Sequence, residues 1–341
     1  MAPMRVLLAP DKFAGTLSAV AAAAALAAGW SRSAPGDVLD LAPLSDGGPG
    51  FVEVLHAALG GRLIRLDVEG PLGASTPATV LLDRGVAYVE AAQACGLHLV
   101  APAARDPLRA TTRGVGALLQ AALASGATRV VVGVGGTAST DGGRGAVEAL
   151  GRGWPAGVDL VVATDVDTPL LGPMGAAAVF GPQKGATPAQ VAELESRLAA
   201  WVTVCGTDPD LPGAGAGGGL GYGLLVLSGR RAPGIDTVLD AIGFDARVRA
   251  ADLVITGEGS FDFQSLRGKA PAGVAVRAQA AGRPCLVLAG RVDVGRREAA
   301  AAGIEAAHAV VDLVGAEAAF ADPAAGLADL AADVARQWSR G

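Results

Sequence analysis

The sequence predicts an α/β protein with two domains: a doubly wound, flavodoxin- or Rossmann-like domain with a parallel sheet, interrupted by an inserted mixed α/β domain. Three observations support this class. Short apolar runs alternate with loops and helical segments at both ends of the chain, as in βαβ units. In the middle, the apolar runs follow one another too closely for helical crossovers. A chain of 341 residues also exceeds the size at which single cores usually stop growing.

The N-terminal part begins with an apolar run at 5–10, which predicts a strand, and continues with a helix over 18–30. A strand over 37–44 and a helix around 51–59 repeat this order. We therefore expect two βα units of a parallel sheet at the start of the chain.

The pattern changes in segment 62–91, which predicts an antiparallel hairpin because D-R-G at 83–85 is a turn signal. The segments that follow are expected to form a helix, two strands and a further helix, over 114–125, 128–134, 158–164 and 188–202.

From residue 252 the βα rhythm resumes. D-L-V-I-T-G-E-G and P-C-L-V-L-A-G predict buried strands, with a helix near 270–281 between them, and A-H-A-V-V-D-L precedes the last helix. We therefore predict a discontinuous doubly wound domain, formed by 1–66 and 251–341, and an inserted domain over 67–250. In open α/β sheets, ligands bind beyond the carboxyl ends of the strands.

The composition limits the class of protein. Hydrophobic residues make up 51% of the chain, and the formal charge of −6 argues against a nucleic-acid partner. Three scattered cysteines fit a reducing compartment. Asp11 and Lys12 interrupt the N-terminal apolar run, and the Ala-rich segment 19–28 is short for a membrane span. We expect a cytoplasmic protein without a membrane partner, and a homo-oligomer is left open.

Polar, glycine-rich loops recur at the predicted strand ends, at 45–48, 135–143, 165–169, 181–185, 213–221 and 257–264. Such loops suit phosphates, because missing Cβ atoms let backbone N–H groups converge on oxygens. Nearby carboxylates suit Mg²⁺, so the loops together predict phosphoryl transfer. The expected substrate- and phosphate-binding residues are Asp11, Ser45, Gly47, Gly48, Gly135, Gly136, Thr137, Ser139, Gly142, Gln183, Gly215, Gly217, Gly218, Asp262, Gln264 and Lys269.

Lysine is rare in this chain. Of 27 basic residues, only Lys12, Lys184 and Lys269 are lysines, and the chain has no asparagine. Where arginine fills almost every basic position, a retained lysine suggests a site that needs a compact point charge, as phosphate binding does. We predict that Lys12 and Lys184 are catalytic, because they would neutralise charge on a phosphoryl group in transfer.

Five carboxylates are further candidates. Asp165 and Asp167 would point to one face of an extended segment, and with Glu258 they are the candidate Mg²⁺ ligands. A turn before Pro169 is the alternative for the two aspartates. Asp46 or Asp141 could orient the attacking hydroxyl and accept its proton, although either could be a plain turn residue before a glycine.

Two nucleotide-binding motifs are not supported. Gly213–Gly218 matches G-x-G-x-x-G, but it follows T-D-P-D-L-P and not a strand, so the dinucleotide fingerprint lacks its context. No G-x-x-x-x-G-K-[ST] motif occurs in the sequence. An NAD(P)-linked oxidoreductase and a non-catalytic binding protein stay as alternatives to a kinase.

The chain resembles the type I glycerate kinase family almost from end to end. The motifs are A-P-D-K-F-A-G-T-L-S, P-L-S-D-G-G, R-D-P-L-R-A-T-T-R-G-V-G, G-V-G-G-T-A-S-T-D-G-G, D-V-D-T-P-L-L-G, F-G-P-Q-K-G-A, P-G-A-G-A-G-G-G-L-G and D-L-V-I-T-G-E-G-S-F-D-F-Q-S. The resemblance implies ATP- and Mg²⁺-dependent phosphorylation of D-glycerate to 2-phosphoglycerate in a cleft between two domains. A 3-phosphoglycerate-forming enzyme is the nearest alternative.

The sequence departs from the family pattern at a few positions. Thr140 and Thr168 stand where the family usually has Asn, and Pro49 stands where it usually has Glu. The stretch between Gly143 and Val158 is also shorter. The absence of Asn from the whole chain makes composition bias the simpler reason for the two threonines.

Overall fold

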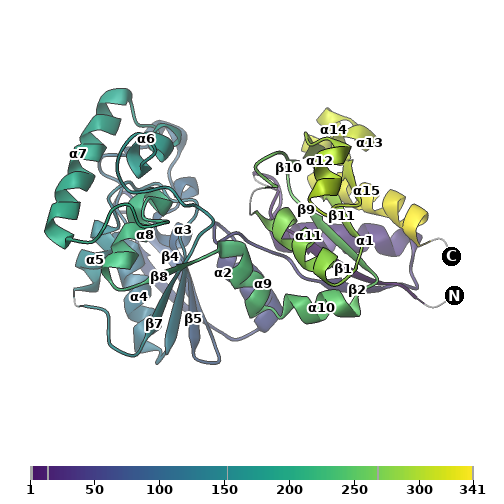
Figure 1. Ribbon diagram of the computed structural model, residues 1–341, viewed down its shortest axis with the longest axis horizontal. Coiled ribbons are helices and arrows are strands. Elements are labelled where there is room, and N and C mark those ends of the chain that lie inside the picture. The colour runs from purple at the N-terminus through teal and green to yellow at the C-terminus, as the bar shows by residue number, and fades with distance from the viewer. Residues whose placement is uncertain (1–2, 14, 152, 267–268, 340–341) are drawn as a thin grey trace. The chain divides into compact units, whose positions relative to one another are not determined.

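The computed structural model describes residues 3–13, 15–151, 153–266 and 269–339. The chain forms two compact units, one of Met1–Ser45, Glu53–Ala58 and Ile235–Gly341 and the other of Asp46–Val52 and Leu59–Gly234. Both contain a sheet covered by helices (Figure 1). The predicted α/β class is confirmed.

The first unit contains a five-stranded sheet in the order β13-β11-β9-β1-β2, and every pair in it is parallel. β1, β9 and β11 are almost wholly buried, as expected for strands with helices on both faces. β2 lies on one side of β1, whereas β9, β11 and β13 follow one another on its other side. The strand order therefore reverses at β1. The strands are β1 (Arg5–Pro10), β2 (Val38–Leu41), β9 (Leu253–Gly257), β11 (Cys285–Ala289) and β13 (Ala306–Ala309).

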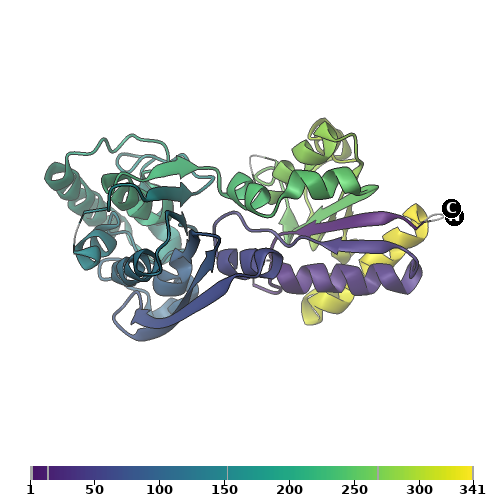
Figure 2. The ribbon, with the colours of Figure 1, turned by 90° about the horizontal axis from the view of Figure 1, so that it is seen from below.

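Helix α1 (Ala19–Ser33) packs against α15 (Pro323–Trp338) on the same unit, and Figure 2 shows the purple α1 beside the yellow α15. The Ser18 side chain caps α1 by accepting from the backbone N–H of Ala21. A Cβ on Gly29 would lie 2.0 Å from the Ala328 carbonyl oxygen, so the two helices approach too closely for a side chain. The unit's other elements are α9 (Gly234–Ala241), α10 (Phe244–Ala250), β10 (Ser260–Phe261), α11 (Ala270–Ala280), β12 (Arg291–Val292), α12 (Arg296–Ala301), α13 (Val310–Val314) and α14 (Ala316–Ala321), and α2 (Phe51–Leu59) is shared between the units.

The second unit contains a six-stranded mixed sheet in the order β3-β4-β5-β6-β7-β8. The first three strands are antiparallel and the rest are parallel. Asp83 pairs with Val86, and Arg84 and Gly85 between them have φ of 44° and 81°, so the predicted D-R-G turn is a two-residue hairpin loop. The strands are β3 (Arg62–Glu69), β4 (Ser75–Asp83), β5 (Val86–Glu90), β6 (Arg129–Gly133), β7 (Asp159–Ala163) and β8 (Arg230–Ala232).

Helices α3 (Ala91–Cys95), α4 (Arg113–Ala124), α5 (Arg144–Leu150), α6 (Ala176–Phe180), α7 (Pro188–Cys205) and α8 (Ala216–Val226) belong to the second unit, with short 3₁₀ turns at Leu97–Leu99, Pro102–Ala104 and Pro182–Lys184. The predicted glycine-rich loop over 213–221 overlaps the start of α8. Within this overlap Gly217, Gly218 and Gly219 take left-handed φ of 62°, 69° and 87°, so the backbone is kinked and not helical there. The regular part of α8 follows these glycines.

The predicted domain boundaries differ from those of the units. Residues 59–66 lie in the second unit, because β3 pairs with β4 along its whole length. Residues 235–250 lie in the first unit, because Arg277 of α11 pairs with Asp240 of α9 at 3.1 Å and with Asp245 of α10 at 2.9 Å. The assignment of the units to a parent and an inserted domain stays a prediction. In the part of the chain that the structure describes, no helix has the length and apolar character to cross a membrane.

Candidate active site

Asp11 and Lys12 follow β1 at the carboxyl edge of the first unit's sheet. The pairing of Pro10 with Gly257 places Asp11 beside Glu258, which follows β9. Asp11 is 5% exposed, and its Oδ1 accepts from the Lys12 backbone N–H at 2.7 Å and lies 3.7 Å from Lys12 Nζ. This edge lies where the strand order reverses, which is the usual ligand position in such sheets.

Glu258 is a buried carboxylate at this edge. Its side chain is 8% exposed, and within the described residues its Oε1 has no hydrogen-bond donor. Burial raises its pKa from 4.5 to about 7, and the charges of Asp11 and Asp262 add to this effect, whereas the Ser265 hydroxyl and Lys269 oppose it. A buried carboxylate oxygen without a donor is one that a ligand proton or a cation would satisfy.

The other predicted residues of the first unit lie in the loops around this edge. Asp262 Oδ1 accepts from the backbone N–H groups of Gln264 at 2.7 Å and Ser265 at 3.2 Å, so this carboxylate holds the loop after β10. Lys269 precedes α11 at its N-cap position, and Ser45 is 1% exposed. Their contact with a ligand stays a prediction.

Replacing Glu258 with Gln should weaken the pH dependence of stability. The folded protein keeps the Glu258 proton up to about pH 7, whereas the unfolded chain loses it near pH 4.5. The stability linked to this group is therefore fully present below pH 4.5 and is lost as the pH rises to 7, by ~3 kcal/mol in total. Denaturant unfolding in EDTA should show a fall between pH 5 and pH 8 that is about 2 kcal/mol smaller in Glu258→Gln. The exposed Glu317→Gln is the control, and equal pH profiles for the three proteins would contradict the expectation.

In the second unit, Asp141 lies in the 135–143 loop and is held by hydrogen bonds. Its Oδ2 accepts from the N–H and the hydroxyl of Thr112, both at 2.9 Å, and from the Gly145 N–H at 3.2 Å. Its Oδ1 accepts from the Gly143 N–H at 3.1 Å. The carboxylate thus joins α4 to the start of α5, an arrangement that suits a structural role better than proton transfer.

Lys184 lies beneath the same loop and is 3% exposed. Its Nζ donates to the Ser139 carbonyl oxygen at 2.5 Å and to Thr137 Oγ1 at 3.2 Å. No carboxylate among the described residues forms an ion pair with it. Burial lowers its pKa from 10.5 to about 8, and the nearby Cys95 and Asp141 act in the opposite direction. A buried ammonium without a counter-charge favours the approach of an anion.

The glycine loops of the second unit meet around Lys184. A Cβ on Gly218 would lie 2.0 Å from the Ser139 carbonyl oxygen and 2.6 Å from Lys184 Nζ. The Gly142 N–H donates to the Gly218 carbonyl oxygen at 3.2 Å. The structure thereby brings together the predicted residues of the 135–143 and 213–221 segments and Lys184, while Gln183 accepts through its carbonyl oxygen from Arg105 at 3.3 Å.

Asp46 and Asp165 approach each other at Gly234. The Gly234 N–H donates to Asp165 Oδ1 at 2.8 Å, and a Cβ on this glycine would lie 2.1 Å from the Asp46 carbonyl oxygen. Asp46 Oδ1 accepts from the Gly48 N–H at 3.1 Å. Gly47 and Gly48 lie against the start of the 135–143 loop, since the Gly135 N–H donates to the Gly47 carbonyl oxygen at 3.1 Å.

The predicted Mg²⁺ ligands do not form a cluster. Asp167 pairs with Arg231 at 2.7 Å, and over the described ranges no three His, Cys, Asp or Glu side chains gather as a metal site would require. Mg²⁺ often needs only one or two protein carboxylates beside phosphate oxygens. Glu258, with its unpartnered buried oxygen, and Asp165 fit that pattern, whereas Asp167 is occupied by an arginine.

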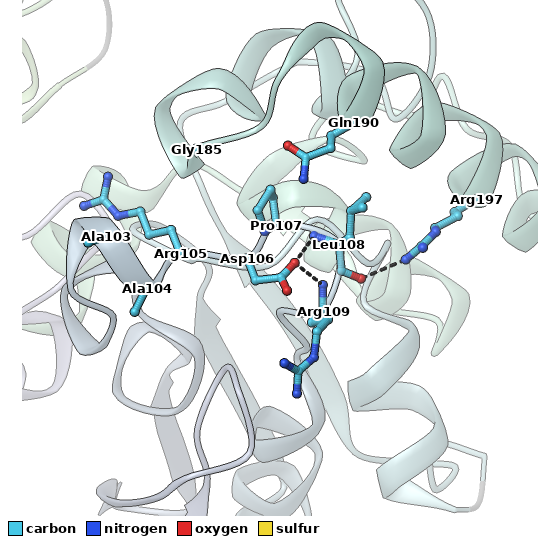
Figure 3. Close-up of a pocket in the computed structure, with 10 residues that line it drawn as sticks. All are labelled: Ala103, Ala104, Arg105, Asp106, Pro107, Leu108, Arg109, Gly185, Gln190 and Arg197. Atoms are coloured by element: carbon cyan, nitrogen blue, oxygen red, sulfur yellow. Dashed lines mark hydrogen bonds between the residues drawn. The ribbon is translucent and has the colours of Figure 1, made fainter.

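No residue of the R-D-P-L-R segment was among the predicted site residues, although the segment is part of a family motif. In the structure, Arg105, Asp106 and Arg109 line a cavity of about 740 Å³, together with Gln190 and Arg197 of α7 (Figure 3). The signal was available as two arginines and an aspartate within five residues, but the contribution of α7 could not be read from the sequence.

Known proteins with similar sequences point to one family. The profile of the glycerate kinase family matches residues 6–154 and 152–339. A glycerate kinase of Halalkalibacterium halodurans is 40% identical over 343 residues, which cover 90% of each chain. The glycerate 2-kinase of Escherichia coli K12 is 38% identical over 331 residues, covering 86% of this chain and 87% of that relative. A crystal structure provisionally named glycerate kinase 2, from Salmonella typhimurium LT2, matches with a TM-score of 0.81 at 35% identity and covers 99% of this chain and 98% of its own.

Proposed function

Because the chain belongs to the glycerate kinase family, we propose that it phosphorylates the 2-hydroxyl of D-glycerate with ATP and releases 2-phosphoglycerate and ADP. In this reaction the substrate oxygen forms a bond to the γ-phosphorus, the bond from that phosphorus to the β,γ-bridging oxygen breaks, and the hydroxyl proton passes to a base. The family implies kinase activity and use of ATP. The relative named glycerate 2-kinase, at 38% identity, supports the choice of the 2-hydroxyl.

The single observation that carries phosphoryl transfer in this chain is the buried ammonium of Lys184, which has no carboxylate partner among the described residues. It lies under a loop whose glycines allow the backbone to approach closely, since a Cβ on Gly218 would lie 2.6 Å from Lys184 Nζ. We assign Lys184 to the stabilisation of phosphate charge, because preorganised charge in a site without water is the largest contribution available to such a reaction. Lys12, beside Asp11 at the other unit's sheet edge, is the second cation of the proposal.

Asp46 is the better candidate for the proton acceptor. Asp141 is the alternative, but its two oxygens already accept from Thr112, Gly143 and Gly145. Asp46 precedes a glycine turn that lies against the 135–143 loop. A carboxylate in this position would orient the hydroxyl and take its proton as the phosphorus–oxygen bond forms.

Asp165 and Glu258 are the proposed protein ligands of Mg²⁺. When bound, the ion neutralises phosphate oxygens. Asp165 is held in place by the Gly234 N–H, and Glu258 offers an oxygen to which no described residue donates. The location of the reaction between two domains, the cytoplasmic setting and the oligomeric state stay predictions.

A coupled assay of ADP release tests the proposal. The purified protein with Mg²⁺-ATP should release ADP only when D-glycerate is present, and proton-coupled ³¹P NMR should show the phosphoryl group on the 2-oxygen. Hydroxypyruvate and tartronate are the matched acids for comparison. A phosphate group on the 3-oxygen would contradict the proposed position of phosphorylation. The kinase assignment would be contradicted if ADP were released without glycerate, or if no ADP were released at all.

A further inference from the structure

The cavity beside the R-D-P-L-R segment is lined by residues to which the proposed mechanism has assigned no role. It has a volume of about 740 Å³ and is lined by residues 103–109, Gly185 and two residues of α7. Figure 3 shows Gln190 and Arg197 approaching from α7 above the 105–109 segment. A volume of this size suits a small molecule and its water.

The lining carries a positive charge in a chain whose net charge is negative. Arg105, Arg109 and Arg197 contribute three positive charges and Asp106 contributes one negative charge, and Arg197 is paired with Glu193 of its own helix. In the described part of the protein, the Arg109 guanidinium has no hydrogen bond or ion pair, and the buried Nε of Arg105 has no acceptor. The two guanidinium groups point to opposite sides of the segment (Figure 3). The Arg109 guanidinium is therefore the group that would bind the two oxygens of a carboxylate.

The same cavity offers groups for a hydroxyl. Asp106 Oδ1 accepts from the backbone N–H groups of Leu108 and Arg109, both at 3.2 Å, and among the described residues its other oxygen has no donor. Gln190 uses its Oε1 to accept from the Thr187 N–H at 2.9 Å, which leaves its amide N–H₂ for a ligand. Figure 3 shows both side chains at the cavity.

We propose that this cavity binds a small hydroxy acid, with the Arg109 guanidinium group on the carboxylate and with Asp106 and Gln190 on the hydroxyl group that is not phosphorylated. The inference rests on the proposed function, because the hydroxy acid expected to bind here is glycerate, the acceptor of the proposed reaction. Arg109 is thereby a specificity-determining residue of the acceptor site.

A nucleotide fits the cavity less well. The lining residues include no aromatic side chain for a base, and a polyphosphate would be repelled by Asp106 much more strongly than a single carboxylate. Arg105 is also adjacent to the Lys184 loop, since a Cβ on Gly185 would lie 3.4 Å from Arg105 Cβ. A hydroxy acid held here would therefore be bound next to the proposed phosphate cation.

Replacing Arg109 with Gln tests the inference by splitting the kinetic constants. We expect the KM for D-glycerate to rise about tenfold or more, with the KM for ATP within about twofold of wild type. The substitution removes no hydrogen bond or ion pair within the described structure, so the fold should be kept, as thermal unfolding would verify. The control is Arg65→Gln, which removes an exposed arginine from β3 of the same unit. Asp106→Asn is a second variant with the same expected loss of glycerate affinity.

Calorimetric titration of the nucleotide-free protein with D-glycerate, and separately with ADP, gives a readout that does not need turnover. Loss of glycerate binding in Arg109→Gln supports the inference. Unchanged glycerate binding, or weakened binding of ADP alone, overturns it. If the wild-type protein releases no ADP with glycerate, the proposed function fails. The titration still shows, by the same two outcomes, whether the cavity binds the acid.

Discussion

Replacing Lys184 with Met should lower kcat/KM at pH 7 by about a hundredfold or more, which is ~2.7 kcal/mol of transition-state stabilisation. The same change should leave the free energy of unfolding at pH 7 at or above the wild-type value. The two effects have one cause, because Lys184 is a buried ammonium with no counter-ion in the described part of the chain. A charge of this kind destabilises the empty protein and stabilises a bound anion.

Two opposing terms set the expected change in stability. The fall of the Lys184 pKa from 10.5 to about 8 corresponds to ~3 kcal/mol against the charged form in the folded state. Methionine removes this penalty but leaves the Ser139 carbonyl oxygen without its donor, which costs ~1–3 kcal/mol. The net change in the free energy of unfolding is therefore near zero or stabilising. If the lysine were purely structural, its replacement would clearly lower the stability.

The pH dependence of unfolding provides a second readout for Lys184. The unfolded chain holds this proton up to about pH 10.5 and the folded protein only up to about pH 8. The stability linked to Lys184 is therefore present above pH 10.5 and is lost as the pH falls toward 8. Denaturant unfolding at pH 7 and pH 10 should show a rise in the wild type that Lys184→Met lacks. Thr137→Val, which removes a hydrogen-bond acceptor but no charge, is the control. A large loss of stability in Lys184→Met, or turnover close to that of the wild type, would show that the lysine only supports the loop.

The parts of the fold that the sequence predicted are those determined by local patterns. The buried strand at Arg5–Pro10, the capped helix that begins at Ala19 and the hairpin turn at Arg84 each depend on neighbouring residues. The short strand Arg230–Ala232 has no apolar pattern, and it forms because β7 lies beside it. The glycine-rich segment at the start of α8 was predicted as a loop, and its three successive glycines are indeed non-helical. The close packing of Gly218 on Ser139 could not be read from the sequence.

The candidate site shows the same division between local and long-range information. The scarcity of lysine selected Lys184, and composition could not reveal that it is buried and unpaired. The sequence made Asp141 a candidate base, whereas the structure surrounds it with donors that include Thr112, 29 residues away in the chain. The cavity depends on the approach of Arg197 to Leu108, 89 residues away. Contacts of this range depend on the packing of helices and sheets, which no local pattern records.

Replacing Gly218 with Ala should lower the free energy of unfolding by about 3 kcal/mol or more and abolish most of the activity. Gly218 has a φ of +69°, and a Cβ added to it would lie 2.0 Å from the Ser139 carbonyl oxygen. A methyl group there would push away the backbone that Lys184 binds. The left-handed conformation alone costs alanine ~1 kcal/mol, so the remainder measures the close approach of the two loops.

Gly206→Ala separates these two contributions. Gly206 has nearly the same φ of +70° at the end of α7, but no described atom lies within 4 Å of its Cβ position. This control should lose only ~1 kcal/mol and keep full activity. Denaturant unfolding and the ADP-release assay on both variants measure the difference. Equal losses in the two variants would mean that the loops can separate without consequence, and the packing of the 213–221 segment on Ser139 and Lys184 would then have no part in the function.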